Sequence, residues 1–236
     1  MRLVKVIISV FLFLSVAGFV YAGTWIEDFD RGNYNGWTLL RGTENHRAEI
    51  SVVSGELVFK HFNIPSEGTE DWIVLEASKD WSDYTIELRF KYTELGPIDL
   101  KGLLLTYNDT FEGVPEGGPN CPFAFVQPNG TVMGLNAVKG VFNVITTGTY
   151  DAMPNKWYNV KILNQRTHYE IYIDDQKILA YDDSISDKGG VGIGARDMIT
   201  YFDDIRITGD NVPDGTSSSV DMIGKSATTW AEIKRR

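Results

Sequence analysis

The chain has 236 residues, of which 43% are hydrophobic, and a formal net charge of −10 at pH 7. Such an acidic chain offers no basic face to nucleic acid or anionic lipid, so we exclude nucleic acid as a partner. Cys121 is the only cysteine, which excludes an intramolecular disulfide and favours a buried, small apolar side chain at this position.

Residues 1–22 have the pattern of a secretory signal peptide. Arg2 and Lys5 precede an apolar run over residues 6–20, and the segment ends in Ala22, a small residue at the position that a signal peptidase reads. A membrane anchor is the alternative, but the uninterrupted apolar core is shorter than the ~20 residues needed to span a bilayer. We therefore expect cleavage before Gly23 and a periplasmic, extracellular or cell-surface protein. No later segment approaches spanning length.

The first part of the mature chain consists of short strand-like runs separated by turn residues. Residues 50–53 and 57–60 flank a Ser54-Gly55 turn, which predicts a hairpin. Residues 84–92 alternate apolar and polar side chains, the pattern of a strand with one buried face. Residues 103–105 are three leucines, apolar on both faces, as expected of a central strand between two packed layers.

The last folded third shows the same period of two. Residues 156–162, 169–179 and 201–207 each alternate, and Asp174-Asp175-Gln176 breaks the middle block into a predicted hairpin. Residues 189–195 read Gly-Gly-Val-Gly-Ile-Gly-Ala, whose spacing does not fit a dinucleotide-binding loop. As a strand, this stretch has its glycines on one face, where a neighbouring backbone or a ligand can approach closely.

This order of blocks resembles the laminin-G-like, concanavalin A-like jelly-roll domains of secreted bacterial proteins. It also resembles the related domain of 3-keto-disaccharide hydrolases over much of residues 24–208. The resemblance implies an all-β fold, a two-sheet antiparallel jelly-roll sandwich over residues 23–209, in which the glycine-rich strand is architectural. It implies less about activity, because this fold carries lectins, glycanases and adhesion modules alike.

Two acidic clusters lie at opposite ends of the predicted domain, with Glu27, Asp28 and Asp30 near its start and Asp203 and Asp204 near its finish. In the resembled families the first and last strands are neighbours, which brings these clusters together. Carboxylate oxygens suit Ca²⁺, so we predict a structural calcium ion held by Glu27, Asp28, Asp203 and Asp204. Only one of Asp203 and Asp204 is expected to face inward from a regular strand. The alternative is that all are surface carboxylates at turns.

A catalytic motif is not evident in the sequence. The glycosidases built on this fold use Glu-x-Asp-x-Glu strands, and no such spacing occurs here. Glu170 and Asp174 have no third partner, and His46, His61 and His168 are scattered. The resemblance rests on strand patterns, so it carries no catalytic assignment. This absence is the main argument against an enzyme.

A ligand-binding face is predicted around the longest irregular region, residues 108–120, because long loops in compact domains are often functional. Sugar rings stack on flat aromatic side chains while their hydroxyls bind amides and carboxylates. We assign Trp72, Tyr107, Phe123 and Gln127 to this face. The alternative for each aromatic residue is a place in the sandwich core.

Residues 210–236 are predicted to lie outside the domain, as a flexible linker and a basic tail. The linker is rich in serine, glycine and proline, and residues 225–236 carry a local positive charge around Trp230. The tail is a candidate for retention at a cell surface, with a disordered end as the alternative.

The sequence as a whole predicts a secreted, lectin-like β-sandwich that binds carbohydrate or polysaccharide, with a structural calcium ion. A hydrolase or lyase acting on glycosides on the same fold is the first alternative. A surface adhesion protein with protein partners is the second.

Overall fold

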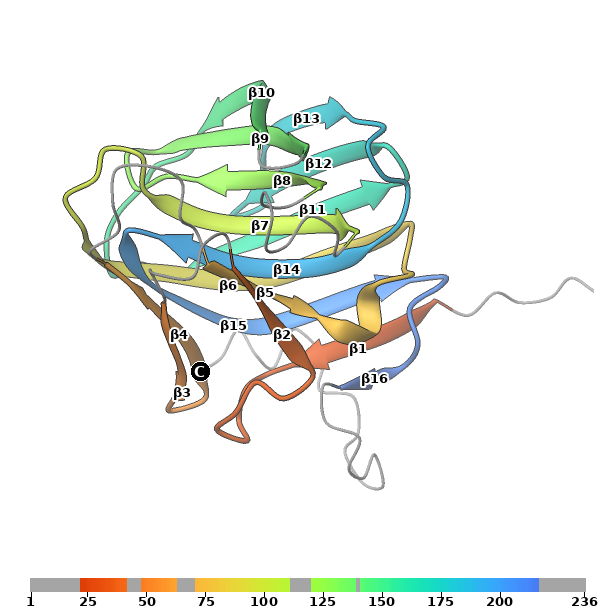
Figure 1. Cartoon of the computed structure of the whole chain (residues 1–236), viewed down its shortest axis with the longest axis horizontal. Helices are drawn as coiled ribbons and strands as arrows, with labels where there is room; N and C mark the ends of the chain where they lie inside the picture. The colour runs from red at the N-terminus through yellow and green to blue at the C-terminus, as the bar shows by residue number, and fades with distance from the viewer. Residues whose placement is uncertain (1–21, 42–47, 63–70, 111–119, 139–140, 217–236) are drawn as a thin grey trace, which may run out of the picture.

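Two β-sheets pack face to face in the computed structural model of the protein (Figure 1). The structure describes residues 22–41, 48–62, 71–110, 120–138 and 141–216. Within these residues the sheets have nine and seven strands, and the only helical element is the short 3-10 helix η1, Glu76–Ser78. The predicted all-β, two-sheet jelly-roll sandwich is confirmed. No helix in the described part of the chain is long and apolar enough to cross a membrane.

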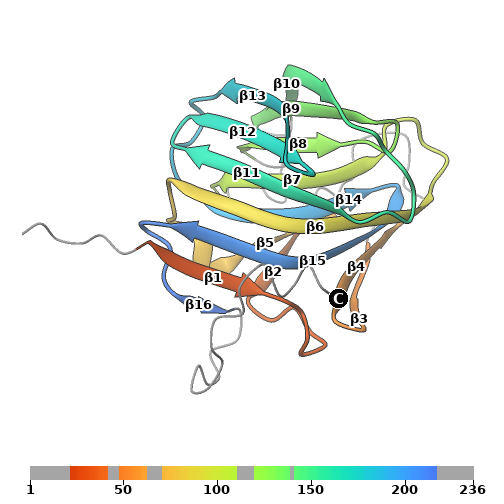
Figure 2. The ribbon, with the colours of Figure 1, turned by 180° about the vertical axis from the view of Figure 1, so that it is seen from behind.

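The nine-stranded sheet faces the viewer in Figure 2 and follows the order β13-β12-β11-β6-β15-β1-β16, with the β3–β4 hairpin attached to β15. Its strands are β1 Gly23–Glu27, β3 Glu49–Val53, β4 Glu56–His61, β6 Tyr84–Leu95, β11 Tyr158–Gln165, β12 His168–Ile173, β13 Gln176–Asp182, β15 Met198–Gly209 and β16 Gly215–Thr216. Its pairs are antiparallel except β1–β16, which is parallel.

The seven-stranded sheet faces the viewer in Figure 1 and follows the order β10-β9-β8-β7-β14-β5-β2. Its strands are β2 Trp37–Arg41, β5 Asp71–Leu75, β7 Gly102–Asp109, β8 Cys121–Val126, β9 Thr131–Val138, β10 Val141–Thr149 and β14 Gly190–Arg196. All of its pairs are antiparallel. β7 lies between β14 and β8, so the three leucines at 103–105 do form part of a central strand.

Alternating side chains supply the core between the sheets. On β6 every second residue from Tyr84 to Tyr92 is buried, while the residues between them are half-buried on the outer side. The same alternation holds on β11 and β12. Each fully buried apolar side chain contributes roughly 1.5–3 kcal/mol, so the register that buries all of them together is strongly favoured.

Both predicted hairpins are present. Ser54 and Gly55 join β3 to β4 with φ angles of 55° and 81°, and Asp174 and Asp175 join β12 to β13 with φ angles of 49° and 64°. Two-residue hairpin turns with both φ angles positive match the twist of the flanking strands, and Gly, Asn and Asp tolerate them best.

The glycine-rich stretch forms β14, and its glycines do allow close approach of neighbouring strands. A Cβ atom on Gly194 would lie 2.3 Å from the Asp71 carbonyl oxygen and 2.6 Å from the Trp72 Cβ. A Cβ atom on Gly192 would lie 2.3 Å from the Thr106 hydroxyl. The glycines are therefore architectural in this sheet.

The C-terminal boundary of the folded part lies later than predicted. β16 pairs with β1, and Val212 is buried in the core at 3% exposure. The boundary drawn after Gly209 is therefore too early, because an apolar side chain in the predicted linker packs on the sandwich. The predicted signal peptide, apart from Ala22, and the basic tail from residue 217 lie outside the described residues.

Candidate functional site

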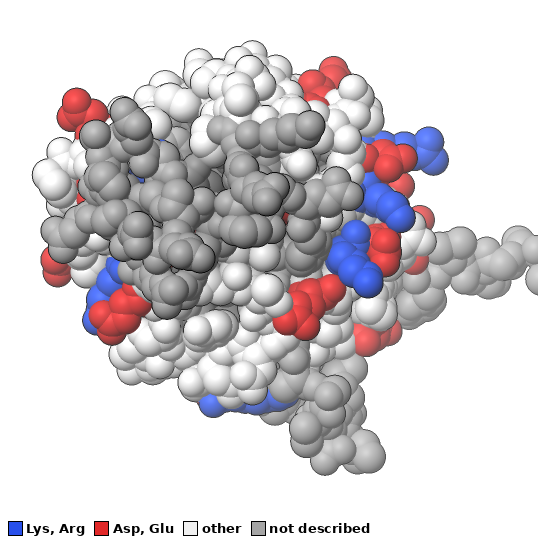
Figure 3. Space-filling model, viewed as in Figure 1, with Lys and Arg blue, Asp and Glu red and all other residues white. Residues whose placement is uncertain are grey.

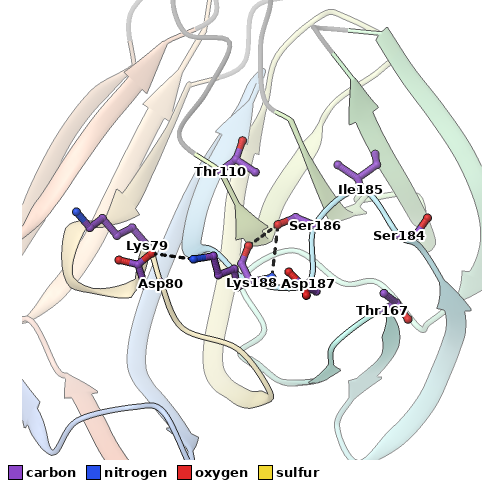
Figure 4. A pocket seen from close by; sticks show the side chains of 9 residues that line it. All are labelled: Lys79, Asp80, Thr110, Thr167, Ser184, Ile185, Ser186, Asp187 and Lys188. Carbon is purple, nitrogen blue, oxygen red and sulfur yellow. Dashed lines mark hydrogen bonds and ion pairs between the residues drawn. The ribbon is translucent and has the colours of Figure 1, made fainter.

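A polar cleft of about 660 Å³ opens at one end of the sandwich (Figure 4). The segment between β13 and β14 forms one wall, and residues beside η1, after β7 and in the β11–β12 turn complete it. The lining residues are Lys79, Asp80, Thr110, Thr167, Ser184, Ile185, Ser186, Asp187 and Lys188. The cleft thus brings together four segments that are far apart in the sequence.

The lining of the cleft offers hydroxyl groups and balanced charge. Four side chains carry hydroxyls, two are lysines and two are aspartates, and Ile185 is the apolar member. The Lys188 Nζ lies 3.3 Å from the Asp80 carboxylate, and the Ser186 hydroxyl donates to the Lys188 carbonyl oxygen. In the space-filling view, basic and acidic side chains likewise lie side by side on the right of the molecule (Figure 3). Such a lining suits a neutral ligand rich in hydroxyls.

A buried asparagine fixes the cleft wall to the core. Asn108 is fully buried and has a φ angle of 51°. Its Nδ2 lies 3.2 Å from the Ser186 carbonyl oxygen, 3.1 Å from that of Arg166 and 2.9 Å from the Tyr169 hydroxyl. Its Oδ1 accepts from Asn164 Nδ2 at 2.6 Å. This network satisfies the buried polar groups and sets the wall on the rigid sandwich.

Tyrosine hydroxyls extend this network. The Tyr84 hydroxyl donates to the Gly189 carbonyl oxygen at 3.2 Å and accepts from the backbone N–H of Asn108 at 2.9 Å. The Tyr169 hydroxyl donates to the Ser186 carbonyl oxygen at 3.3 Å. Burial raises the pKa of both Tyr84 and Tyr169, so both stay neutral donors over the working pH range. The segment between β13 and β14 is therefore held at its middle, by Ser186, and at its last residue, Gly189.

A second hollow of about 380 Å³ adjoins the cleft and shares Thr167 and Ser184 with it. Its other lining residues are Asn136, Ile145, Asp182 and Asp183. Asp183 is built into the fold: it accepts from Asn136 Nδ2 at 2.6 Å and from the Ile185 amide at 2.8 Å. Ser184 thus stands where the two hollows join.

The ligand-binding residues predicted from the sequence do not line the cleft. Tyr107 is fully buried between the sheets, where its hydroxyl contacts that of Tyr181. Trp72 is fully buried, and Phe123 and Gln127 are 3% and 5% exposed. None of the three rings has an exposed face for stacking, so the structure assigns these rings to packing.

The physical reason is that both faces of the seven-stranded sheet are apolar. Phe123 belongs to a second hydrophobic cluster, separate from the main core, and also contacts Phe142 edge-on with ring centroids 5.6 Å apart. The members of this cluster are Leu104, Phe123, Phe125, Leu135 and Ala137, with Met133 packed against it. The alternative reading of the aromatic residues as core residues is the one that the structure supports. The loop residues 111–119 lie outside the described part, but Thr110 at their start does line the cleft.

The two acidic clusters do meet, because β1 pairs with β15 and Glu27 is opposite Ile205. Asp203 and Asp204, however, both form ion pairs with the guanidinium group of Arg89. Arg89 Nε lies 2.9 Å from Asp204, and an Arg89 Nη2 nitrogen 2.5 Å from Asp203. Glu27 accepts from the Phe29 amide at 3.0 Å. This donor set does not fit a calcium ion, since a guanidinium already balances the two carboxylates.

Among the described residues, no three His, Cys, Asp or Glu side chains come together as a metal-binding group. Asp28 and Asp30 lie close enough to Asp204 for their charges to oppose its ionisation, and burial is the main cause that raises the pKa of Asp204. The calcium ion stays a prediction of the sequence, and we derive no function from it.

The expectation that only one of Asp203 and Asp204 faces inward is wrong. The register of β15 against β6 shifts between Asp203 and Arg206, and Asp204 has a φ angle of 51°. Such a bulge breaks the alternation of the strand, so both carboxylates reach the same side of Arg89. The pKa of Asp203 is raised to about 6, mainly by burial. The hydrogen bond from Arg89 acts in the opposite direction and lowers this pKa, but its effect is the smaller one.

A buried histidine near an aspartate was not singled out by sequence reasoning. His61 Nε2 lies 3.9 Å from Asp71, and both side chains are fully buried. The Asp197 amide donates to His61 Nδ1 at 3.1 Å, so the ring proton of the neutral form is on Nε2. With its lone pair occupied by a backbone donor, this imidazole does not fit the role of a general base.

The cleft residues themselves were also missed. The stretch over residues 182–190 reads Asp-Asp-Ser-Ile-Ser-Asp-Lys-Gly-Gly, a polar, turn-forming segment between two strands. Its composition indicates a surface loop, which is a signal for a candidate site. Its meeting with Thr110 and Thr167 depends on the sheet topology, which no local pattern contains.

Comparison with known proteins agrees with this architecture. No curated protein sequence matches the chain. The carbohydrate-binding module CBM66 from Bacillus subtilis has the same fold, with a TM-score of 0.54 and 20% identity over 74% of this chain and 96% of the module. A β-glucanase of Bacillus licheniformis is similar with a TM-score of 0.55 and 15% identity, over 79% of this chain and 98% of the enzyme.

The lumenal domain of VIP36 in its Ca²⁺-bound form is a third neighbour, with a TM-score of 0.52 and 12% identity, over 78% of this chain and 88% of that domain. At these identities the likeness concerns the fold. A sequence model of the 3-keto-α-glucoside-1,2-lyase-like domain matches residues 24–208, which span the sandwich from β1 to β15. The chain belongs to the family of 3-keto-α-glucoside-1,2-lyase-like domains.

Proposed function

We propose that this domain recognises neutral carbohydrate, with the polar cleft at the end of the sandwich as the binding site. The observation that carries the proposal is the lining of the cleft, in which four hydroxyl side chains stand beside two lysines and two aspartates. A sugar hydroxyl both donates and accepts hydrogen bonds. The hydroxyl, lysine and aspartate side chains of the cleft supply donors and acceptors for it, and their charges balance.

The rigidity of the wall supports recognition. Asn108 and Tyr169 hold the Ser186 carbonyl oxygen, and Asp183 holds the Ile185 amide, so the segment between β13 and β14 is preorganised. A preorganised site loses less entropy on binding than a loop that must first become ordered. The likeness to a carbohydrate-binding module and to the lumenal domain of VIP36 concerns the fold, and it is compatible with this function.

The charge of the site favours neutral over anionic sugars. The cleft balances two lysines with two aspartates, and the adjoining hollow adds Asp182 and Asp183. An anionic polysaccharide would approach these carboxylates on a chain whose net charge is already −10. Secretion, which the sequence predicts, would give the domain access to such glycans.

A second candidate function is a lyase or hydrolase acting on glycosides. The specific observation in its favour is the family match, which covers the sandwich over residues 24–208. In this case the same cleft would hold the sugar, and catalytic groups would act on a bond of the bound glycan.

The test is a glycan panel with neutral, amino-sugar and uronate-containing oligosaccharides, in which every bound ligand is recovered and checked for cleavage. Binding of neutral glycans without cleavage supports recognition alone. Cleavage supports the second candidate. Selective binding of uronates, or no binding of any glycan, contradicts the proposal, and the latter result would favour the adhesion alternative.

A further inference from the structure

The strand β10 lies at one end of the seven-stranded sheet, and the residues of its first half, Val141–Ile145, are all exposed. In its second half Gly148 lies against Ile178 of β13. Within the described residues it pairs along one edge only, with β9. Its apolar residues Val141, Phe142, Val144 and Ile145 are 62%, 39%, 56% and 40% exposed. Large apolar side chains on adjacent positions of a strand normally alternate between core and solvent, so this strand resembles one half of an interface.

The strand also lacks the usual protection of a sheet edge. Natural edge strands carry charged residues or proline, which prevent pairing with another chain. None of the nine residues from Val141 to Thr149 is charged or a proline, although the chain has 54 charged residues in total. In the space-filling view the upper middle of the molecule, where Figure 1 has β10, is white, and acidic side chains lie only toward the right and left of it (Figures 1 and 3).

We propose that β10 pairs with β10 of a second copy of this chain, in an antiparallel arrangement that continues the seven-stranded sheet across a two-fold axis. A two-fold axis places each strand against itself, so any charged residue near the axis would meet a like charge. An uncharged strand on a chain of net charge −10 is the segment along which two copies approach without that repulsion.

The bulge in β10 selects the part that pairs. The register against β9 shifts between Val144 and Thr146. Val141–Val144, before this shift, pairs with β9 in unbroken register, so we take this part of β10 as the one that pairs with the second copy. Phe142 is anchored there by its edge-on contact with Phe123. An axis between Phe142 and Asn143 puts Val141 of each copy opposite Val144 of the other, and these are the two most exposed large apolar residues of the strand.

The first test is the mass of the purified full chain by light scattering, compared with the double variant Val141→Lys, Val144→Lys. The matched control is Leu100→Lys, Met153→Lys, which adds the same charge at side chains that are 44% and 50% exposed. We expect a dimer for the wild type and the control. For the β10 variant we expect a monomer that still unfolds cooperatively, with its melting temperature lowered only by the loss of dimerisation. A monomeric wild type, or a dimer that survives the β10 lysines, would overturn the proposal.

The second test fixes the register and does not depend on the lysine variants. Val141→Cys and Val144→Cys chains are prepared separately, and Cys121 is buried and stays unreactive. Random pairing in an equimolar mixture makes about half of the dimers mixed, so oxidation should cross-link up to about half of the chains in the mixture, while either variant alone should give little. Equal cross-linking in all three samples, or none in the mixture, would contradict this pairing.

Discussion

Asn108 Nδ2 donates to the Ser186 carbonyl oxygen at 3.2 Å, which ties a fully buried side chain of β7 to the wall of the cleft. The two residues are 78 positions apart in the chain, so this bond forms only when both sheets are in place. The stability of the sandwich and the shape of the candidate site therefore depend on the same network.

Replacing Asn108 with Asp should destabilise the protein by about 3 kcal/mol, because a carboxylate would face the carbonyl oxygens that Nδ2 now binds. Asp tolerates the positive φ angle at this position, so backbone strain does not confuse the result. Protonation restores a donor, so the loss should be smaller at pH 4 than at pH 8. Urea unfolding at both pH values measures this, with Asn129→Asp at an exposed turn as the control. An equal loss at both pH values would show that the donor is not the cause.

Trp72→Phe and Tyr107→Phe separate the two interpretations of the aromatic residues. Both side chains are fully buried, so we expect losses of about 1–3 kcal/mol in stability and no change in glycan affinity. Thermal unfolding and calorimetric titration of a bound glycan measure the two effects. Loss of glycan binding by a variant that still folds would restore the ligand face predicted from the sequence.

Asp203 should make the protein less stable as the pH rises through about 6. Its pKa in the folded state is raised by burial to about 6, so the native state binds more protons than the unfolded state between roughly pH 4 and 6. Asp203→Asn removes this titration. The free energy of unfolding of the variant, relative to that of the wild type, should therefore rise by about 1 kcal/mol between pH 4 and pH 7. This figure is reduced to allow for screening by solvent. Urea unfolding at several pH values measures this difference. A difference in stability between the two proteins that stays constant from pH 4 to pH 7 would contradict the raised pKa.

The calcium prediction of the sequence is tested by a chelator. Because Arg89 already pairs with Asp203 and Asp204, we expect a melting temperature that EDTA does not change. Arg89→Gln should cost about 2 kcal/mol, since it leaves two half-buried carboxylates without a cation. A melting temperature that falls in EDTA and recovers with Ca²⁺ would show that the ion is bound after all.

Period-two patterns predicted the strands because they depend on residues that are neighbours in the sequence. Tyr84 to Tyr92 and the Asp174-Asp175 turn form as expected for this reason. The face assignments of Trp72 and Tyr107 failed, because strands in the middle of this sandwich are apolar on both sides and the pattern does not tell one buried face from the other.

Features that depend on long-range pairing were beyond the sequence. The bulge at Asp204 arises from the register of β15 against β6, and it undoes the alternation from which only one of Asp203 and Asp204 was expected to face inward. The cleft requires Asp80, Thr110 and Thr167 to meet the segment between β13 and β14. The resemblance to jelly-roll domains supplied the neighbouring positions of β1 and β15, which a single sequence does not show.

The most direct test of carbohydrate recognition in the cleft is calorimetric titration of Ser184→Tyr with a glycan that binds the wild type. Ser184 is exposed where the two hollows join, so a tyrosine there should fill the site without disturbing the core. The matched control is Ser51→Tyr on β3, which lines neither hollow. We predict at least a tenfold loss of affinity for Ser184→Tyr and wild-type affinity for the control. Undiminished binding by Ser184→Tyr would contradict the proposed site.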